Sequence, residues 1–152
     1  MRLWHQLLIP YLDDKRLLNQ HCTCCALRGN GWGKKHSIVD YVFAYNVSHL
    51  FEYHDVVMME MFKRGYEVKD HYWYDNTFCG RKLTFLAIKD VDSYKYHPGD
   101  PLIFKEHNNE YLRECLLTLK AKGVELVNVS IDEALIQLDL YETVNFDVLK
   151  LS

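Results

Sequence analysis

The sequence has 152 residues, of which 49% are apolar, and its formal net charge is −3. This length suits one domain, and the apolar content is enough for a single hydrophobic core. Because there is no run of eighteen apolar residues and no apolar signal-peptide core near the N-terminus, we expect a cytoplasmic protein without a membrane segment.

The first third of the chain predicts two helices. The first starts near Pro10 and Asp13 and stops at Gly29. Helical spacing gives it an apolar stripe of Leu18, Cys22 and Cys25, flanked by Leu17, His21 and Cys24. After a glycine-rich break, a short second helix is expected from Ser37, whose S-x-x-D pattern with Asp40 resembles a capping box.

Three further helices are predicted around an irregular middle. The first runs from about Ser48 to Gly65, and two more follow over about 109–123 and from the Ser130-x-x-Glu133 capping box. The positions expected to be buried are, helix by helix, Leu50, His54, Val57, Met58 and Met61; Leu112, Cys115, Leu116 and Leu119; and Ala134, Leu135, Leu138 and Tyr141. Residues 66–107 are aromatic and lack a sustained helical period. The sequence therefore predicts a mainly α fold, a single compact helical domain over residues 1–152 with an irregular aromatic-rich middle segment.

The cysteines raise the possibility of a metal site. There are five, an odd number that argues against a disulfide framework and for reduced thiols. Ligands suited to Zn²⁺ or Cu⁺ crowd into one short stretch as His21, Cys22, Cys24 and Cys25. A helix turns Cys22 and Cys24 about 200° apart, whereas zinc knuckles use C-x₂-C on a turn. We therefore expect no metal and no cofactor, and a metal-binding protein stays an alternative.

Charge is distributed unevenly along the chain. Residues 1–36 carry six Lys or Arg against two acidic residues, whereas residues 124–152 carry one Lys against six acidic residues. A basic front and an acidic tail suit a protein that offers one face to a polyanion. Because no dense basic run exists, charge by itself does not establish nucleic-acid binding.

Three segments carry a family resemblance. They are Met1–His5 (MRLWH), Leu17–Gly29 (LLNQHCTCCALRG) and residues 60–70 (EMFKRGYEVKD), the last of which looks like the pattern E-x-x-K-R-G-[FY]-x-[IV]-K-D. Together they resemble the pyrimidine-dimer DNA glycosylase (endonuclease V) family. The resemblance is firm over residues 1–70 and loose over residues 105–123, and the bacterial branch with the MRLWH N-terminus is the most similar.

The resemblance implies chemistry at the N-terminal amine. In this family that amine attacks the sugar and forms a Schiff base, beside a glutamate on the first helix. An α-amine has a pKa of about 7.7–8.0, so a useful neutral fraction exists at physiological pH. Here Arg2 is too bulky for ordinary methionine removal, so the amine belongs to Met1. Thr23 stands at the glutamate position, and a threonine hydroxyl does not ionise near neutral pH.

The family pattern also assigns the remaining site residues. Met1, Thr23, Arg28 and His21 are the candidate catalytic residues, and Arg2, Lys15, Arg16, Lys34, Lys35 and His36 the candidate DNA contacts. His5, Asp13 and Asp14 are further candidate proton carriers. The resemblance thus implies a protein that recognises duplex DNA with a lesion or an abasic site, with impaired imine chemistry. We expect a monomer without a membrane partner, although the sequence does not determine the oligomeric state. A catalytically inactive nucleic-acid or partner-binding module on the same scaffold is the main alternative.

Overall fold

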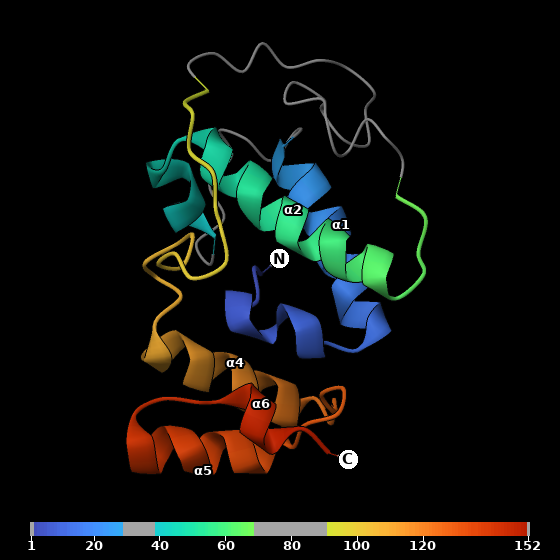
Figure 1. The fold of residues 1–152 in the computed structure, drawn as a ribbon, viewed down its shortest axis with the longest axis vertical. Helices are drawn as coiled ribbons and strands as arrows, with labels where there is room; N and C mark the ends of the chain where they lie inside the picture. Colours follow the sequence, from blue (N-terminus) through green and yellow to red (C-terminus); the bar gives the residue numbers. More distant parts are fainter. Residues whose placement is uncertain (1, 29–38, 69–90, 152) are drawn as a thin grey trace.

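The computed structural model describes residues 2–28, 39–68 and 91–151 (Figure 1). Its elements are the 3₁₀ helix η1 (Gln6–Tyr11), α1 (Asp14–Arg28), the 3₁₀ helix η2 (Asp40–Ala44), α2 (Val47–Lys63), α4 (Asn109–Ala121), α5 (Ile131–Tyr141) and α6 (Phe146–Leu149). The described residues contain no strand. The predicted mainly α fold, a single compact helical arrangement, is confirmed.

Side-chain caps set the starts of the longer helices. Asn46 accepts a hydrogen bond from the Ser48 amide at the start of α2, and Asn108 and Ser130 cap α4 and α5 in the same way. These short polar side chains satisfy amides that have no partner within the helix. At the other end of α2, Gly65 takes a φ of +89°, and the Tyr66 amide donates to the Met61 carbonyl at 3.0 Å. Such a left-handed glycine ends a helix without a Cβ penalty.

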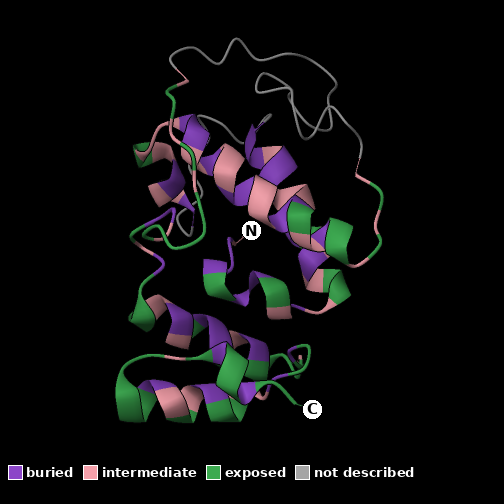
Figure 2. Cartoon of the chain, viewed as in Figure 1, coloured by how far each residue is buried: buried purple, intermediate pink, exposed green. Residues whose placement is uncertain are grey.

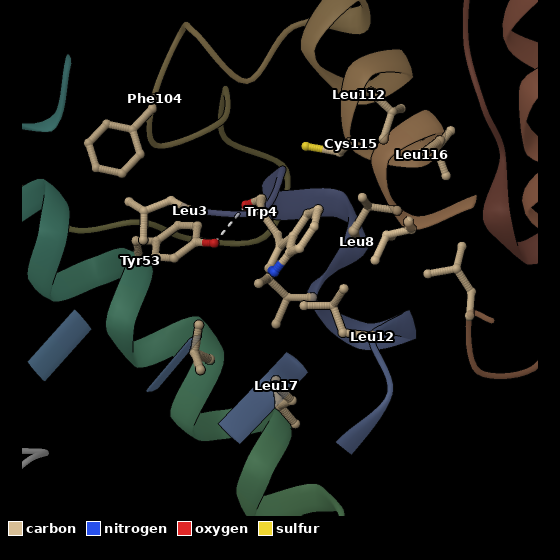
Figure 3. Packing of buried hydrophobic residues seen from close by; sticks show 14 of the residues in the cluster. Leu3, Trp4, Leu8, Leu12, Leu17, Tyr53, Phe104, Leu112, Cys115 and Leu116 are labelled. Carbon is tan, nitrogen blue, oxygen red and sulfur yellow. Dashed lines mark hydrogen bonds between the residues drawn. The ribbon is translucent and has the colours of Figure 1, made fainter. Parts of the chain in front are cut away.

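The N-terminal segment lies in the centre of the molecule. Figure 1 shows it between the pair α1 and α2 on one side and α4 on the other, with α5 beyond α4. Leu3 and Leu8 are fully buried and pack between Tyr53 of α2 and Leu116 of α4 (Figure 3). Burying each such leucine contributes about 1.5–3 kcal/mol. The first residues of the chain are therefore held by the core on both sides.

The burial pattern corrects the expected face of the first helix. The stripe of α1 that faces the core is formed by Leu17, Gln20, Cys24, Cys25, Leu27 and Arg28. Leu18 and Cys22, which helical spacing puts at the centre of the stripe, are only half-buried. The difference arises because packing against α2 decides which side of α1 is buried. That side includes the polar residues Gln20 and Arg28, which a hydrophobicity pattern does not assign to the core.

The remaining helices agree with the predicted ones in part. The expected buried stripes of α2 and α4 are confirmed, and Figure 2 shows them on the inner faces of these helices. The short second helix is a 3₁₀ helix that begins at Asp40, and Ser37 lies outside the described residues. On α5, Ala134 and Leu138 are buried, but Tyr141, the last residue of the helix, is 68% exposed.

The middle of the chain is irregular where the structure describes it. Residues 91–108 contain turns and extended backbone but no helix. They are fixed by side-chain contacts, as where Tyr94 stacks on His49 with ring centroids 3.8 Å apart and Phe104 fills the core beside Tyr53. The rest of the expected irregular segment, residues 69–90, lies outside the described residues. Within the described ranges, no helix combines the length and the apolarity needed to span a membrane.

Candidate functional site on helices α1 and α2

One side chain fixes the N-terminal segment on α1. Gln20 accepts the Trp4 amide through Oε1 at 2.6 Å and donates from Nε2 to the Arg2 carbonyl at 2.8 Å. Gln20 is 2% exposed, so both bonds are shielded from water. The hydroxyl of Tyr53 on α2 donates to the Trp4 carbonyl at 2.6 Å, as Figure 3 shows. The backbone of residues 2–4 is therefore bonded to both helices.

These hydrogen bonds, called the Gln20 clamp below, hold the N-terminal segment against the stretch of α1 that carries Thr23, a predicted site residue. Thr23 lies three residues after Gln20, so the two side chains share a face of α1 about one turn apart. Thr23 and Cys22 are both half-buried, which leaves part of each side chain accessible from outside. Met1 itself lies outside the described residues. Thr23 therefore offers a hydroxyl about one helical turn from the residue that holds the N-terminal segment, and its role in catalysis stays a prediction.

The expected proton carriers are distributed around α1. Asp13 pairs with Arg16 at 3.2 Å and Asp14 with Arg64 at 3.0 Å, at the start of the helix. Because a helix rises about 1.5 Å per residue, Asp13 and Asp14 lie about 14 Å along α1 from Thr23. These carboxylates are thus engaged in ion pairs at the far end of α1.

The two histidines are also turned toward other partners. His5 is 1% exposed, stacks on His107 and accepts the Leu7 amide at 3.1 Å. Burial lowers its pKa to about 4, so it is a neutral core residue at physiological pH. His21 is two residues from Thr23, about 200° around the helix, and faces His54 of α2.

A polar cluster joins α1 to α2 where His21 meets His54. We call the four residues His21, Cys25, Arg28 and His54 the histidine cluster. His21 Nδ1 and His54 Nε2 are 2.8 Å apart, and Arg28 Nη1 is 3.1 Å from His54 Nδ1. The Cys25 Sγ atom lies 3.8 Å from His21 Nε2 and 3.9 Å from His54 Nε2. Arg28 also lies over the Phe51 ring, 4.5 Å from its centroid.

The direction of these hydrogen bonds follows from Arg28. A guanidinium only donates, so His54 Nδ1 must accept and the ring proton of neutral His54 is on Nε2. That proton points to His21 Nδ1, which leaves the His21 proton on Nε2, toward the Cys25 sulfur.

The surroundings keep both imidazoles uncharged. Burial lowers the pKa of His54 well below its usual range, and the charge of Arg28 acts in the same direction. Burial and then Arg28 lower the pKa of His21 to about 4. Both rings are therefore neutral at physiological pH, and Arg28 carries the positive charge of the cluster.

The candidate DNA contacts have different environments. Lys15 is exposed, Arg16 pairs with Asp13, and Arg2 pairs with Glu114 of α4 at 3.6 Å. Arg28, a candidate catalytic residue, is only 3% exposed and lies within the histidine cluster. Lys34, Lys35 and His36 lie outside the described residues, and their assignment as DNA contacts stays a prediction.

Two residues of this region were not identified as site residues from the sequence. Gln20 and His54 each occupy a position in a buried helical stripe, where an apolar residue is the usual choice. A buried polar side chain requires a hydrogen-bonding partner, and that requirement is the signal that could have found them. The sequence does not show which partner is chosen, because the clamp and the cluster join residues 16 and 33 positions apart.

Comparison with known proteins finds one similarity, over the N-terminal part of the chain. The family model described as pyrimidine dimer DNA glycosylase matches residues 1–74. The match includes η1, α1, η2 and α2, which carry both the clamp and the histidine cluster. The predicted family resemblance is thereby confirmed, while the looser resemblance over residues 105–123 lies outside the match. No curated protein and no solved structure matches the chain.

Proposed function

Since the N-terminal half of the chain matches the pyrimidine dimer DNA glycosylase family, we propose that the protein recognises duplex DNA that contains a lesion or an abasic site. We propose further that the Met1 amine retains a weak capacity to form an imine with the sugar. The observation that carries this proposal is the Gln20 clamp, which bonds the backbone of Arg2 and Trp4 to α1. A nucleophile at a chain terminus needs such an anchor, because a free terminus loses much entropy when it is positioned for attack.

The proposed reaction at an abasic site is imine formation between the amine and the sugar aldehyde. The neutral amine adds to the C1′ aldehyde, and the resulting carbinolamine loses water to give an imine. Borohydride reduces that imine to a stable secondary amine, which links protein to DNA. In the family, the glutamate on the first helix is expected to assist the proton transfers of these reaction steps. Thr23 cannot supply a carboxylate, and general acid–base assistance is worth about 10²–10⁴ in rate, so the activity is expected to be weak.

Borohydride trapping on a duplex with one abasic site tests the proposal. Protein with a verified free Met1 amine is expected to give a covalent adduct slowly, and protein with an acetylated N-terminus is expected to give none. Replacing Thr23→Glu restores the carboxylate and is expected to raise the trapping rate by about 10² or more. The matched control is Thr143→Glu, which adds the same charge at an exposed position between α5 and α6. An adduct that persists after acetylation would show that a lysine reacts instead and would refute the role of Met1.

The second candidate function is a binding module without catalysis. The half-buried Cys22-Thr23 pair favours it, because neither side chain offers a carboxylate. This alternative predicts salt-dependent affinity for lesion-containing DNA, since phosphate contacts release counterions, together with no adduct even for Thr23→Glu. An absence of DNA affinity at low salt would refute both candidate functions.

A further inference from the structure

The histidine cluster contains the donor set of a metal site. The ligand atoms of His21, Cys25 and His54 all lie within 4.8 Å of one another. His21 and Cys25 are four residues apart on α1, so the helix presents both on one face, and α2 supplies His54 opposite them. Cys25 and His54 are buried, and His21 is half-buried. One thiol and two imidazoles thus connect α1 and α2, which both lie within the matched residues 1–74.

These donors suit a tetrahedral Zn²⁺ ion. Zinc binds thiolate sulfur at about 2.3 Å and imidazole nitrogen at about 2.0–2.1 Å, so two ligand atoms on one ion are about 3.3–3.7 Å apart. The distances from Cys25 Sγ to the two Nε2 atoms, 3.8 and 3.9 Å, are close to this spacing. We propose that His21, Cys25 and His54 form a zinc-binding site between α1 and α2.

This site differs from the one that the cysteine spacing suggests. Cys24 is buried in the hydrophobic core, and the half-buried Cys22 is not among the three residues whose ligand atoms lie together. Cys25 is the thiol that faces the two imidazoles. His54, which is 29 positions further along the chain than Cys25, completes the set. Zinc requires the thiolate form of Cys25, so binding releases the thiol proton to solvent.

Arg28 controls access to the site. Its N–H at His54 Nδ1 keeps the ring proton of His54 on Nε2, which is the nitrogen that faces Cys25. Zinc can bind that nitrogen only when Arg28 withdraws and the proton moves to Nδ1. The guanidinium charge also repels the cation. Arg28 therefore holds the four residues in a hydrogen-bonded state that competes with zinc, and removing it is expected to strengthen binding.

Titration of chelator-treated protein with Co²⁺, a spectroscopic substitute for Zn²⁺, tests the site. One ion per chain is expected, with the intense visible bands of tetrahedral cobalt and a near-ultraviolet thiolate-to-cobalt band. Cys25→Ser is expected to abolish the thiolate band, and His54→Gln to weaken binding at least tenfold. Cys22→Ser is the matched control and is expected to leave both bands unchanged. Arg28→Met is expected to bind at least tenfold more tightly than the unmodified chain, with zinc displacing the cobalt in competition.

Two outcomes would overturn the inference. One is a thiolate band that survives in Cys25→Ser, which would assign the ion to another cysteine. The other is the absence of tetrahedral cobalt bands in both the unmodified chain and Arg28→Met. Circular dichroism and thermal melting of each metal-free variant establish that it is folded, and His21→Gln replaces His54→Gln if the latter is not. The readout is independent of DNA, so a failure of the proposed function leaves this test unaffected.

Discussion

Buried neutral histidines are expected to make the protein less stable in mild acid, and His107 is the clearest example. His107 is 2% exposed, its Nδ1 accepts the Gln6 amide at 3.1 Å, and its Nε2 lies 2.8 Å from the Tyr41 hydroxyl. A second proton on the ring would have to displace the Gln6 amide from Nδ1. Burial, and then the neighbouring His5, lower the pKa of His107 to about 3.

The sign and size of the effect follow from proton linkage. Folded His107 stays neutral down to about pH 3, whereas the unfolded chain takes up this proton near pH 6.5. The unfolded state therefore binds more protons between these values, and stability falls as pH falls below 6.5. At about 1.36 kcal/mol per pH unit, His107 alone removes about 2 kcal/mol of unfolding free energy between pH 7.5 and pH 5. His5, whose pKa is lowered to about 4, adds a similar amount.

Urea unfolding at pH 7.5, 6.5, 5.5 and 5 measures this effect. His107→Gln is expected to be less stable than the unmodified chain at pH 7.5, because the glutamine repacks imperfectly. Its loss of stability between pH 7.5 and pH 5 is expected to be smaller by about 2 kcal/mol, because one titrating group is gone. The matched control is His97→Gln, which makes the same substitution at a side chain that is 75% exposed. If His107→Gln loses as much stability as the unmodified chain, the assignment of a depressed pKa to His107 is wrong.

Three further predictions concern the clamp, the core and a helix cap. Gln20→Leu leaves the buried Trp4 amide without its acceptor, so we expect a loss of about 1–3 kcal/mol in urea unfolding and a lower yield in borohydride trapping; a full trapping yield would contradict the role of the clamp. Leu8→Ala, in the fully buried N-terminal segment, is expected to cost about 2–5 kcal/mol, whereas Leu140→Ala, at a 68% exposed position, should cost well under 1 kcal/mol by the same assay. Asn46→Ala removes the cap of α2 and is expected to cost about 0.5–2 kcal/mol, and an unchanged melting temperature would show that the cap is unimportant.

The family relationship and the helices were accessible from the sequence because both depend on local information. Helix α2 shows this best: the apolar spacing from Leu50 to Met61 predicts its buried face, and Gly65 predicts its end. Helix α1 shows the limit of the same reasoning. Its core-facing side includes Gln20 and Arg28, which a hydrophobic period cannot include, so the expected stripe was rotated away from the true one.

What the sequence determined by itself is the helical class and the family resemblance of the first half, since both follow from residue identity and short-range spacing. Only the tertiary structure decided what the buried polar side chains do. Gln20 holds the N-terminal segment, and Arg28 orients His54 and His21, because α1 and α2 pack side by side and bury these groups together. A buried polar group must find a partner, and the partner is chosen by the packing of distant segments, which no local pattern specifies.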